Sequence, residues 1–183
     1  DKNGTIFLLD RDYMGGFHEG DNSNVIQTIC DAFPGRTDCA SIREEKDPHV
    51  VRSSPAYWNG YVYFGGQNDK VKAFKLENGK LTTKPVAQSP TIMGFPGVTA
   101  SVSANGTSNG IVWVIDNGNN GTPYHGTLRA YDALDVSKEI YNSRTKGSDG
   151  TGSSFVRFTV PTVANGKVYV VTKDRVSVYG LLK

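Results

Sequence analysis

Two runs of alternating apolar and polar residues near the end of the chain set a pattern that earlier parts of the chain repeat. They lie at residues 168–170 and 176–178, and the polar turn 172–175 joins them. Strict alternation predicts strands that bury one face and leave the other in water. The pair Asn165-Gly166 ahead of the first run is typical of a tight hairpin turn, because both residues tolerate positive φ. This part of the chain therefore predicts a three-stranded meander.

The same pattern recurs earlier in the chain. Residues 54–76 match the final stretch position by position, with equivalent pairs Val62 and Val168, Tyr63 and Tyr169, Val71 and Val176, and Phe74 and Tyr179. A third copy at residues 101–133 contains a Gly/Asn-rich insertion at 116–126, and residues 6–10 match only the last strand of a unit. We therefore expect residues 61–65, 111–115 and 168–171 to be equivalent strands of an all-β protein.

A repeat of three or four strands in each unit is typical of a β-propeller with four-stranded antiparallel blades. A meandering sandwich or barrel with accidental self-similarity is the alternative. Polar segments at 24–29, 81–88 and 139–143 are candidates for the outer strands. In one domain over residues 1–183, we expect a partial blade with a loop insertion at about 1–53, blades at 54–98 and 99–153, and a terminal partial blade at 154–183.

This strand count gives an arc of about three blades, whereas propellers generally close with four to eight. An open arc exposes an apolar blade face at each end, which soluble proteins avoid. We therefore expect another chain to complete the ring: the remainder of the propeller or a second copy.

The charge balance gives no indication of electrostatic capture of nucleic acid or of an anionic membrane. The chain has 183 residues with 20 basic and 18 acidic side chains, a net charge of +2. A balance of this kind does not favour nucleic acid or an anionic membrane as partner. No apolar run approaches the roughly 20 residues that span a bilayer.

The cysteines and the sequons indicate in which cellular compartment the protein is found. Cys30 and Cys39 lie nine positions apart in a polar loop with no His nearby, so they form either a local disulfide or two free thiols, not a zinc site. Three Asn-Gly-Thr sequons in predicted turns are candidate glycosylation sites: Asn3, Asn105 and Asn120. Together these features favour a secreted protein, or a periplasmic one in a bacterium.

No catalytic constellation is visible in the sequence. The densest polar cluster contains Asp10 and Asp12 together with candidate ligand-binding residues Arg11, His18, Glu19 and Asp21, which could bind a cation or a sugar or could cap turns in solvent. Trp58, beside a predicted turn, is a further candidate because aromatic rings stack on sugars and planar cofactors. Trp113 lies between two valines, which favours packing between blades. The three histidines have no spacing that forms a metal site or a nucleophile–base pair.

Three segments of the chain, 8–22, 126–143 and 160–182, resemble the C-terminal part of secreted PQQ-like, or quinoprotein-like, β-propellers. The resemblance implies a propeller fold, and many members carry the repeat without the quinone. A quinone site in the dehydrogenase relatives uses a stacking Trp, a disulfide between adjacent cysteines, and calcium held by acidic and amide side chains. The separation of Cys30 from Cys39 departs from that pattern.

Two functions follow as hypotheses. The first is a non-catalytic secreted module that binds a glycan or a protein, or that serves structurally, with no cofactor. The second is part of a PQQ-dependent oxidoreductase, for which PQQ and calcium would be the cofactors. Near-ultraviolet absorbance by a bound quinone separates the two.

Overall fold

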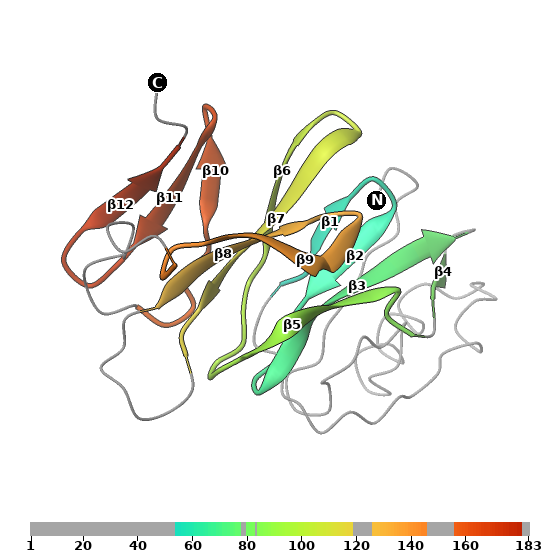
Figure 1. Ribbon diagram of the computed structural model, residues 1–183, viewed down its shortest axis with the longest axis horizontal. Helices are drawn as coiled ribbons and strands as arrows, with labels where there is room; N and C mark the ends of the chain where they lie inside the picture. Colours follow the sequence, from blue (N-terminus) through green and yellow to red (C-terminus); the bar gives the residue numbers. More distant parts are fainter. Residues whose placement is uncertain (1–53, 78–79, 83, 119–125, 146–155, 181–183) are drawn as a thin grey trace, which may run out of the picture.

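The computed structural model describes residues 54–77, 80–82, 84–118, 126–145 and 156–180. These residues form twelve β-strands in three antiparallel sheets and contain no helix (Figure 1). The all-β prediction is therefore confirmed for the part of the chain that the structure describes. The strands predicted at 6–10 and 24–29 lie outside that part.

Each sheet is built from strands that follow one another along the chain. The first sheet contains β1 (Ala56–Trp58), β2 (Tyr61–Phe64), β3 (Asp69–Glu77), β4 (Lys80–Leu81) and β5 (Ala87–Met93), with β4 and β5 both paired to β3. The second contains β6 (Ser101–Asn105), β7 (Ser108–Asp116), β8 (Thr127–Asp132) and β9 (Asp135–Asn142) in that order. The third contains β10 (Thr162–Ala164), β11 (Lys167–Val171) and β12 (Val176–Tyr179). The three predicted equivalent strands are the second strands of the three sheets.

Asn-Gly pairs form the first turn of two sheets, as the sequence predicts. Asn59 and Gly60 have φ values of 46° and 81°, and Asn165 and Gly166 have φ values of 50° and 70°. Two successive residues with positive φ make the turn whose twist matches that of the flanking strands. The hairpins β1–β2 and β10–β11 therefore have the same two-residue connection.

The strand register bears out the equivalence of individual residues. Val62 of β2 lies opposite Phe74 of β3, and Val168 of β11 lies opposite Tyr179 of β12. The sequence comparison paired Val62 with Val168 and Phe74 with Tyr179. The first and third sheets therefore place equivalent residues at equivalent points of their ladders.

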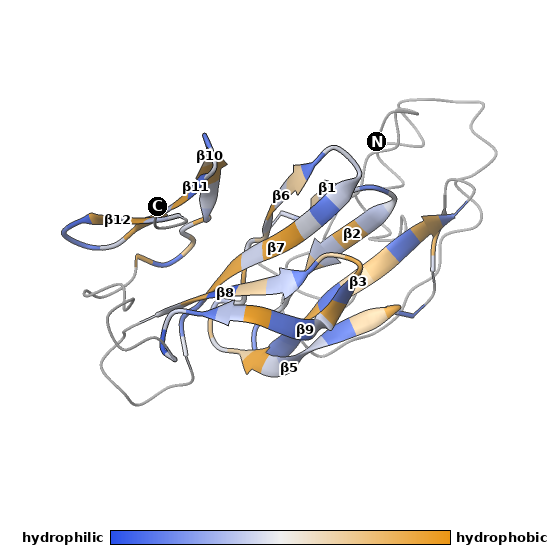
Figure 2. Ribbon diagram, turned by 45° about the horizontal axis from the view of Figure 1, so that its top comes forward, coloured by the Kyte–Doolittle hydropathy of each residue, from blue (hydrophilic) through white to orange (hydrophobic). Residues whose placement is uncertain are grey.

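The three sheets pack face to face in chain order (Figure 1). The first and second sheets share a cluster of buried residues that includes Tyr63, Val71, Val112, Val114 and Tyr131. The second and third sheets share another, which includes Ile115, Leu128, Val168 and Val170. Hydrophobic and hydrophilic segments alternate along the strands of the first two sheets (Figure 2), as expected where strands present different faces. The second sheet thus packs against a neighbouring sheet on each of its faces.

Two predicted outer strands have different bounds from those expected. The segment 81–88 is interrupted, since β4 ends at Leu81 and β5 begins at Ala87. Pro85 lies in this gap, where it has no backbone N–H to give to a ladder. In the second sheet, β9 begins at Asp135, four residues before the predicted start, because a tight turn after β8 places Asp132 opposite Asp135.

Candidate functional site

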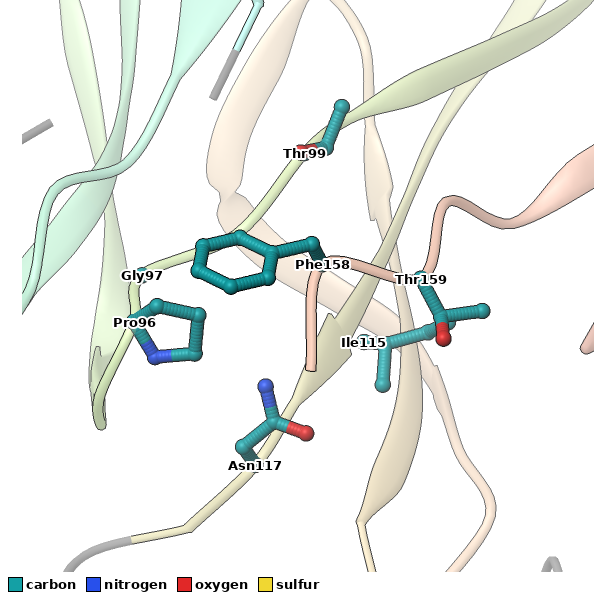
Figure 3. A pocket seen from close by; sticks show the side chains of 7 residues that line it. All are labelled: Pro96, Gly97, Thr99, Ile115, Asn117, Phe158 and Thr159. Atoms are coloured by element: carbon teal, nitrogen blue, oxygen red, sulfur yellow. The ribbon is translucent and has the colours of Figure 1, made fainter. Parts of the chain in front are cut away.

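A small pocket lies where the second sheet, the turn after β5 and the segment before β10 meet (Figure 3). Its walls are formed by Pro96, Gly97, Thr99, Ile115, Asn117, Phe158 and Thr159. The enclosed space is of the order of one water molecule. A sugar ring or a quinone therefore cannot enter it, and a ligand of that size can only lie across its rim.

Phe158 is the most unusual residue of this rim. The residue is 56 % exposed, and its backbone has a φ of 67°. Positive φ in a bulky non-glycine residue is strained and is often found at binding sites. The hydroxyl of neighbouring Thr159 donates a hydrogen bond of 2.6 Å to the carbonyl of Val156, which closes the turn around Phe158. The strained backbone thus holds an aromatic ring at the surface rather than in a core.

One polar side chain, that of Asn117, lies beside the Phe158 ring. Figure 3 shows the ring next to Pro96, with the Asn117 carboxamide projecting toward the same space. Asn117 is half-buried, and within the described part of the chain its side chain makes no hydrogen bond. Arg157, the residue before Phe158, places its guanidinium carbon 4.9 Å from the centroid of the Phe95 ring, a cation–π contact.

A partly buried ion cluster lies next to Asn117 in the second sheet. Arg129 Nε lies 3.0 Å from Asp116 Oδ2, and Arg129 Nη1 lies 2.8 Å from Glu139 Oε2. Burial lowers the pKa of the Arg129 guanidinium, but the carboxylates of Asp116 and Glu139 outweigh this effect and raise it. Asp116 also accepts a hydrogen bond from the Gly118 N–H, and Glu139 accepts one from Asn142 Nδ2. The cluster joins β7, β8 and β9, and its carboxylates are occupied by protein donors.

The outer face of the third sheet is the second notable surface. Three of its valines are about half exposed: Val171, Val176 and Val178. They lie on the face opposite Val168 and Val170, which are buried against the second sheet. We refer to Val171, Val176 and Val178 as the outer valines. They form an apolar strip on a sheet face that nothing in the described part of the chain covers.

The predicted site residues have different outcomes. Trp58 ends β1, where its indole N–H donates a hydrogen bond of 2.8 Å to the Gly106 carbonyl and its ring packs against the core between the first two sheets. Trp113 packs between the second and third sheets, as predicted, and its N–H bonds to Ser103 Oγ. Asn105 lies exposed at the end of β6, a position suited to a glycan. The remaining candidates lie outside the described residues: Asn3, Arg11, His18, Glu19, Asp21, Cys30, Cys39 and Asn120.

The rim around Phe158 was not predicted from the sequence. Phe158 and Asn117 come from segments with no strand periodicity, and only the fold brings them together. No sequence signal marks the positive φ of a phenylalanine.

In the described ranges, no group of three or more His, Cys, Asp and Glu side chains is arranged to hold a metal ion. Those ranges also contain no helix that is both long enough and apolar enough to cross a membrane. Comparison of the chain with family models and with curated proteins found no match.

Proposed function

We propose that this chain is an arc of a β-propeller and acts as a non-catalytic, secreted or periplasmic module that binds protein through its third sheet. The proposal follows the resemblance to PQQ-like propellers and the stacking of three meanders in chain order. Successive blades packed face to face are the defining arrangement of that fold. The exposed sequon residue Asn105 is in keeping with passage through a secretory pathway.

The binding role is inferred from a difference in burial between equivalent residues of the first and third sheets. In the first sheet, Val71 and Ala73 are 0 % and 1 % exposed, since the second sheet packs over them. Their equivalents in the third sheet, Val176 and Val178, are 56 % and 52 % exposed. Contiguous exposed apolar surface of this kind marks interaction sites. The surface that fits these positions is therefore an apolar sheet face like the one that covers the first sheet.

The occupant that we propose is a second copy of this chain. Within the described residues, the apolar face of β2 and β3 that points away from the second sheet is also buried, as shown by Val62 and Phe64. A second copy therefore meets the outer valines with its own outer valines. Such a contact uses the same patch on both partners and closes as a two-fold dimer.

Sedimentation equilibrium over a range of concentrations tests this proposal. We expect a mass above the 19.8 kDa of one chain for the wild type, and a single-chain mass for a variant with Val176→Lys and Val178→Lys. Ile92→Lys and Ile140→Lys, half-exposed positions in the other sheets, serve as matched controls and should leave the dimer intact. A wild-type chain that stays single, or a dimer indifferent to the lysines in β12, would refute the proposed contact.

Absorbance of the purified protein tests the non-catalytic assignment separately. A near-ultraviolet band that remains after dialysis would point instead to the quinoprotein-type oxidoreductase. Absence of the band from the dimer is the result that we expect.

A further inference from the structure

We propose that Asn105 is the attachment site of an N-linked oligosaccharide, which its carboxamide nitrogen, Nδ2, binds covalently. The proposal rests on the secreted or periplasmic location given above. The site lies at the tip of the β6–β7 hairpin in the second sheet, whereas the outer valines lie in the third sheet. It is therefore separate from the contact with a second copy.

Asn105 has a different place in its turn from the asparagines of the other two hairpins. In the β1–β2 and β10–β11 hairpins the asparagine is the first turn residue, and Asn59 and Asn165 have φ values of 46° and 50°. Asn105 is instead the last residue of β6 and lies opposite Ser108. Gly106 is then the first turn residue, with a φ of 59°. A glycine at that position is typical of the type II′ turn.

The turn therefore gives no structural reason for an asparagine at position 105. Asparagine tolerates positive φ, which explains Asn59 and Asn165, but it is depleted in strands. An asparagine beside a turn can also accept a hydrogen bond from a backbone N–H two residues further on. Within the described part of the chain, the Asn105 carboxamide makes no hydrogen bond. A reaction of the carboxamide explains this residue, and packing does not.

The surroundings of Asn105 leave room for a large substituent. Residues 104–109 are all exposed, and this hairpin projects at the same end of the sheets as the β1–β2 and β10–β11 hairpins (Figure 1). Thr107, the second turn residue, supplies the hydroxyl of the Asn-X-Thr acceptor. The turn is held from its inner side, where the Gly106 carbonyl accepts a 2.8 Å hydrogen bond from the Trp58 indole N–H. This anchor uses neither acceptor side chain, so a glycan on Asn105 leaves it intact.

The reaction transfers the oligosaccharide from a polyprenyl diphosphate carrier. Asn105 Nδ2 forms a bond to C1 of the first sugar while the bond between C1 and the diphosphate oxygen breaks. The carboxamide nitrogen loses a proton, and the lipid diphosphate leaves with the bonding electron pair. The product is a neutral secondary amide.

Expression of the full chain behind a yeast secretion leader tests the site. Peptide-N-glycosidase converts a glycosylated asparagine into aspartate, so peptide mass spectrometry then locates each occupied position. We expect Asn105 to be occupied in the wild type and in Thr107→Ser, and unoccupied in Thr107→Ala. A wild-type chain that carries no glycan on Asn105, whether it is recovered from the medium or from the cells, would overturn the proposal.

The same substitution at three asparagines tests whether the fold needs Asn105, with unglycosylated protein made in bacteria. Asn105→Thr should leave the melting temperature unchanged, because threonine is favoured in strands. Asn59→Thr and Asn165→Thr should each lower it by a few degrees, because a β-branched residue is strained at positive φ. An equal loss for Asn105→Thr would show that the asparagine serves the fold, and the proposal would fail. A chain that stays single in sedimentation refutes the dimer contact and leaves this site unaffected, so the two failures are distinguishable.

Discussion

The ring of Trp58 lies directly against Gly110 of the neighbouring sheet. A Cβ atom added at Gly110 would come within 2.5 Å of two carbons of the indole and within 2.8 Å of the Ala133 Cβ. The indole N–H is fixed at the same time by the Gly106 carbonyl. The contact between the first two sheets at this point therefore depends on the absence of a side chain at Gly110.

Gly110→Ala should destabilise the fold by about 1–3 kcal/mol, the usual cost of forcing extra volume into a packed contact. Chemical denaturation measures the change in the free energy of unfolding. Gly180→Ala is the control, since its added Cβ would come no closer than 3.4 Å to the Lys167 Cγ. Equal stability of Gly110→Ala and the wild type would mean that the indole has room to move.

Arg129→Met should cost about 3–5 kcal/mol of stability, because it leaves two carboxylates without their cation. Arg129 and Asp116 expose only 11 % and 6 % of their side chains. Breaking a buried ion cluster by removing one member is far more costly than replacing the whole cluster. A triple variant, Asp116→Asn with Arg129→Met and Glu139→Gln, should therefore recover part of the loss.

The exposed pair Arg175 and Asp174 is the control for this experiment. Arg175→Met should leave the denaturation midpoint unchanged within error, since solvent screens exposed pairs. A triple variant that is less stable than Arg129→Met would show that the cluster holds the strands by hydrogen bonding rather than by charge compensation.

Stability should fall as the pH rises above about 10. Burial, with the nearby Tyr61 and Asp132, raises the pKa of Tyr63, and burial with the Glu139 carboxylate raises the pKa of Tyr131. Above the ordinary tyrosine pKa of about 10, the folded chain keeps protons that the unfolded chain releases. Each such tyrosine therefore removes up to about 1.4 kcal/mol of stability per pH unit until its folded pKa is reached.

Urea denaturation at about pH 9 and about pH 11 measures this slope. Tyr131→Phe should reduce the loss of stability per pH unit, because phenylalanine has no hydroxyl proton that the unfolded chain could release. Tyr63→Phe should reduce it as well, at the cost of the 2.7 Å hydrogen bond from the Tyr63 hydroxyl to the Ala133 carbonyl. A slope that neither substitution alters would assign alkaline sensitivity to other groups.

Cys30 and Cys39 provide a prediction that rests on the sequence alone. We expect them to be bridged, which closes a short loop and stabilises the chain by roughly 2–3 kcal/mol in the chain-entropy model. Intact mass after alkylation without reductant is the measurement. Uptake of two alkyl groups would identify free thiols.

The sequence was sufficient to predict what local patterns determine. Alternation in the three predicted strands and the Asn-Gly pairs at 59–60 and 165–166 predicted the strands and the turns. The repeat also predicted the equivalence of Val62 with Val168 and of Phe74 with Tyr179, which the strand register bears out. These features depend on neighbours along one or two strands, so a repeat reveals them. The packing role of Trp113 followed from its two flanking valines for the same reason.

Contacts between different sheets could not be predicted from the sequence. Trp58 was a candidate ligand platform, and its fit against Gly110 depends on residues about fifty positions apart. Two buried serines show the same limitation. Ser89 Oγ accepts the Val71 N–H and Ser143 Oγ accepts the Leu128 N–H, at equivalent points of two sheets. Serine in a polar segment looks solvent-exposed until the register of the outer strand is known.

The building of each sheet from consecutive strands also sets the order in which the chain can fold. Pairings within a sheet join residues close in sequence, so they close small loops at low entropic cost and form quickly. Each sheet can form soon after its residues are synthesised and dock on the one made before it. The sheet of β10, β11 and β12 is made after the other two described sheets, and it docks on the second sheet through Val168 and Val170. Until this docking step takes place, the face of the second sheet around Ile115 and Leu128 remains exposed to water.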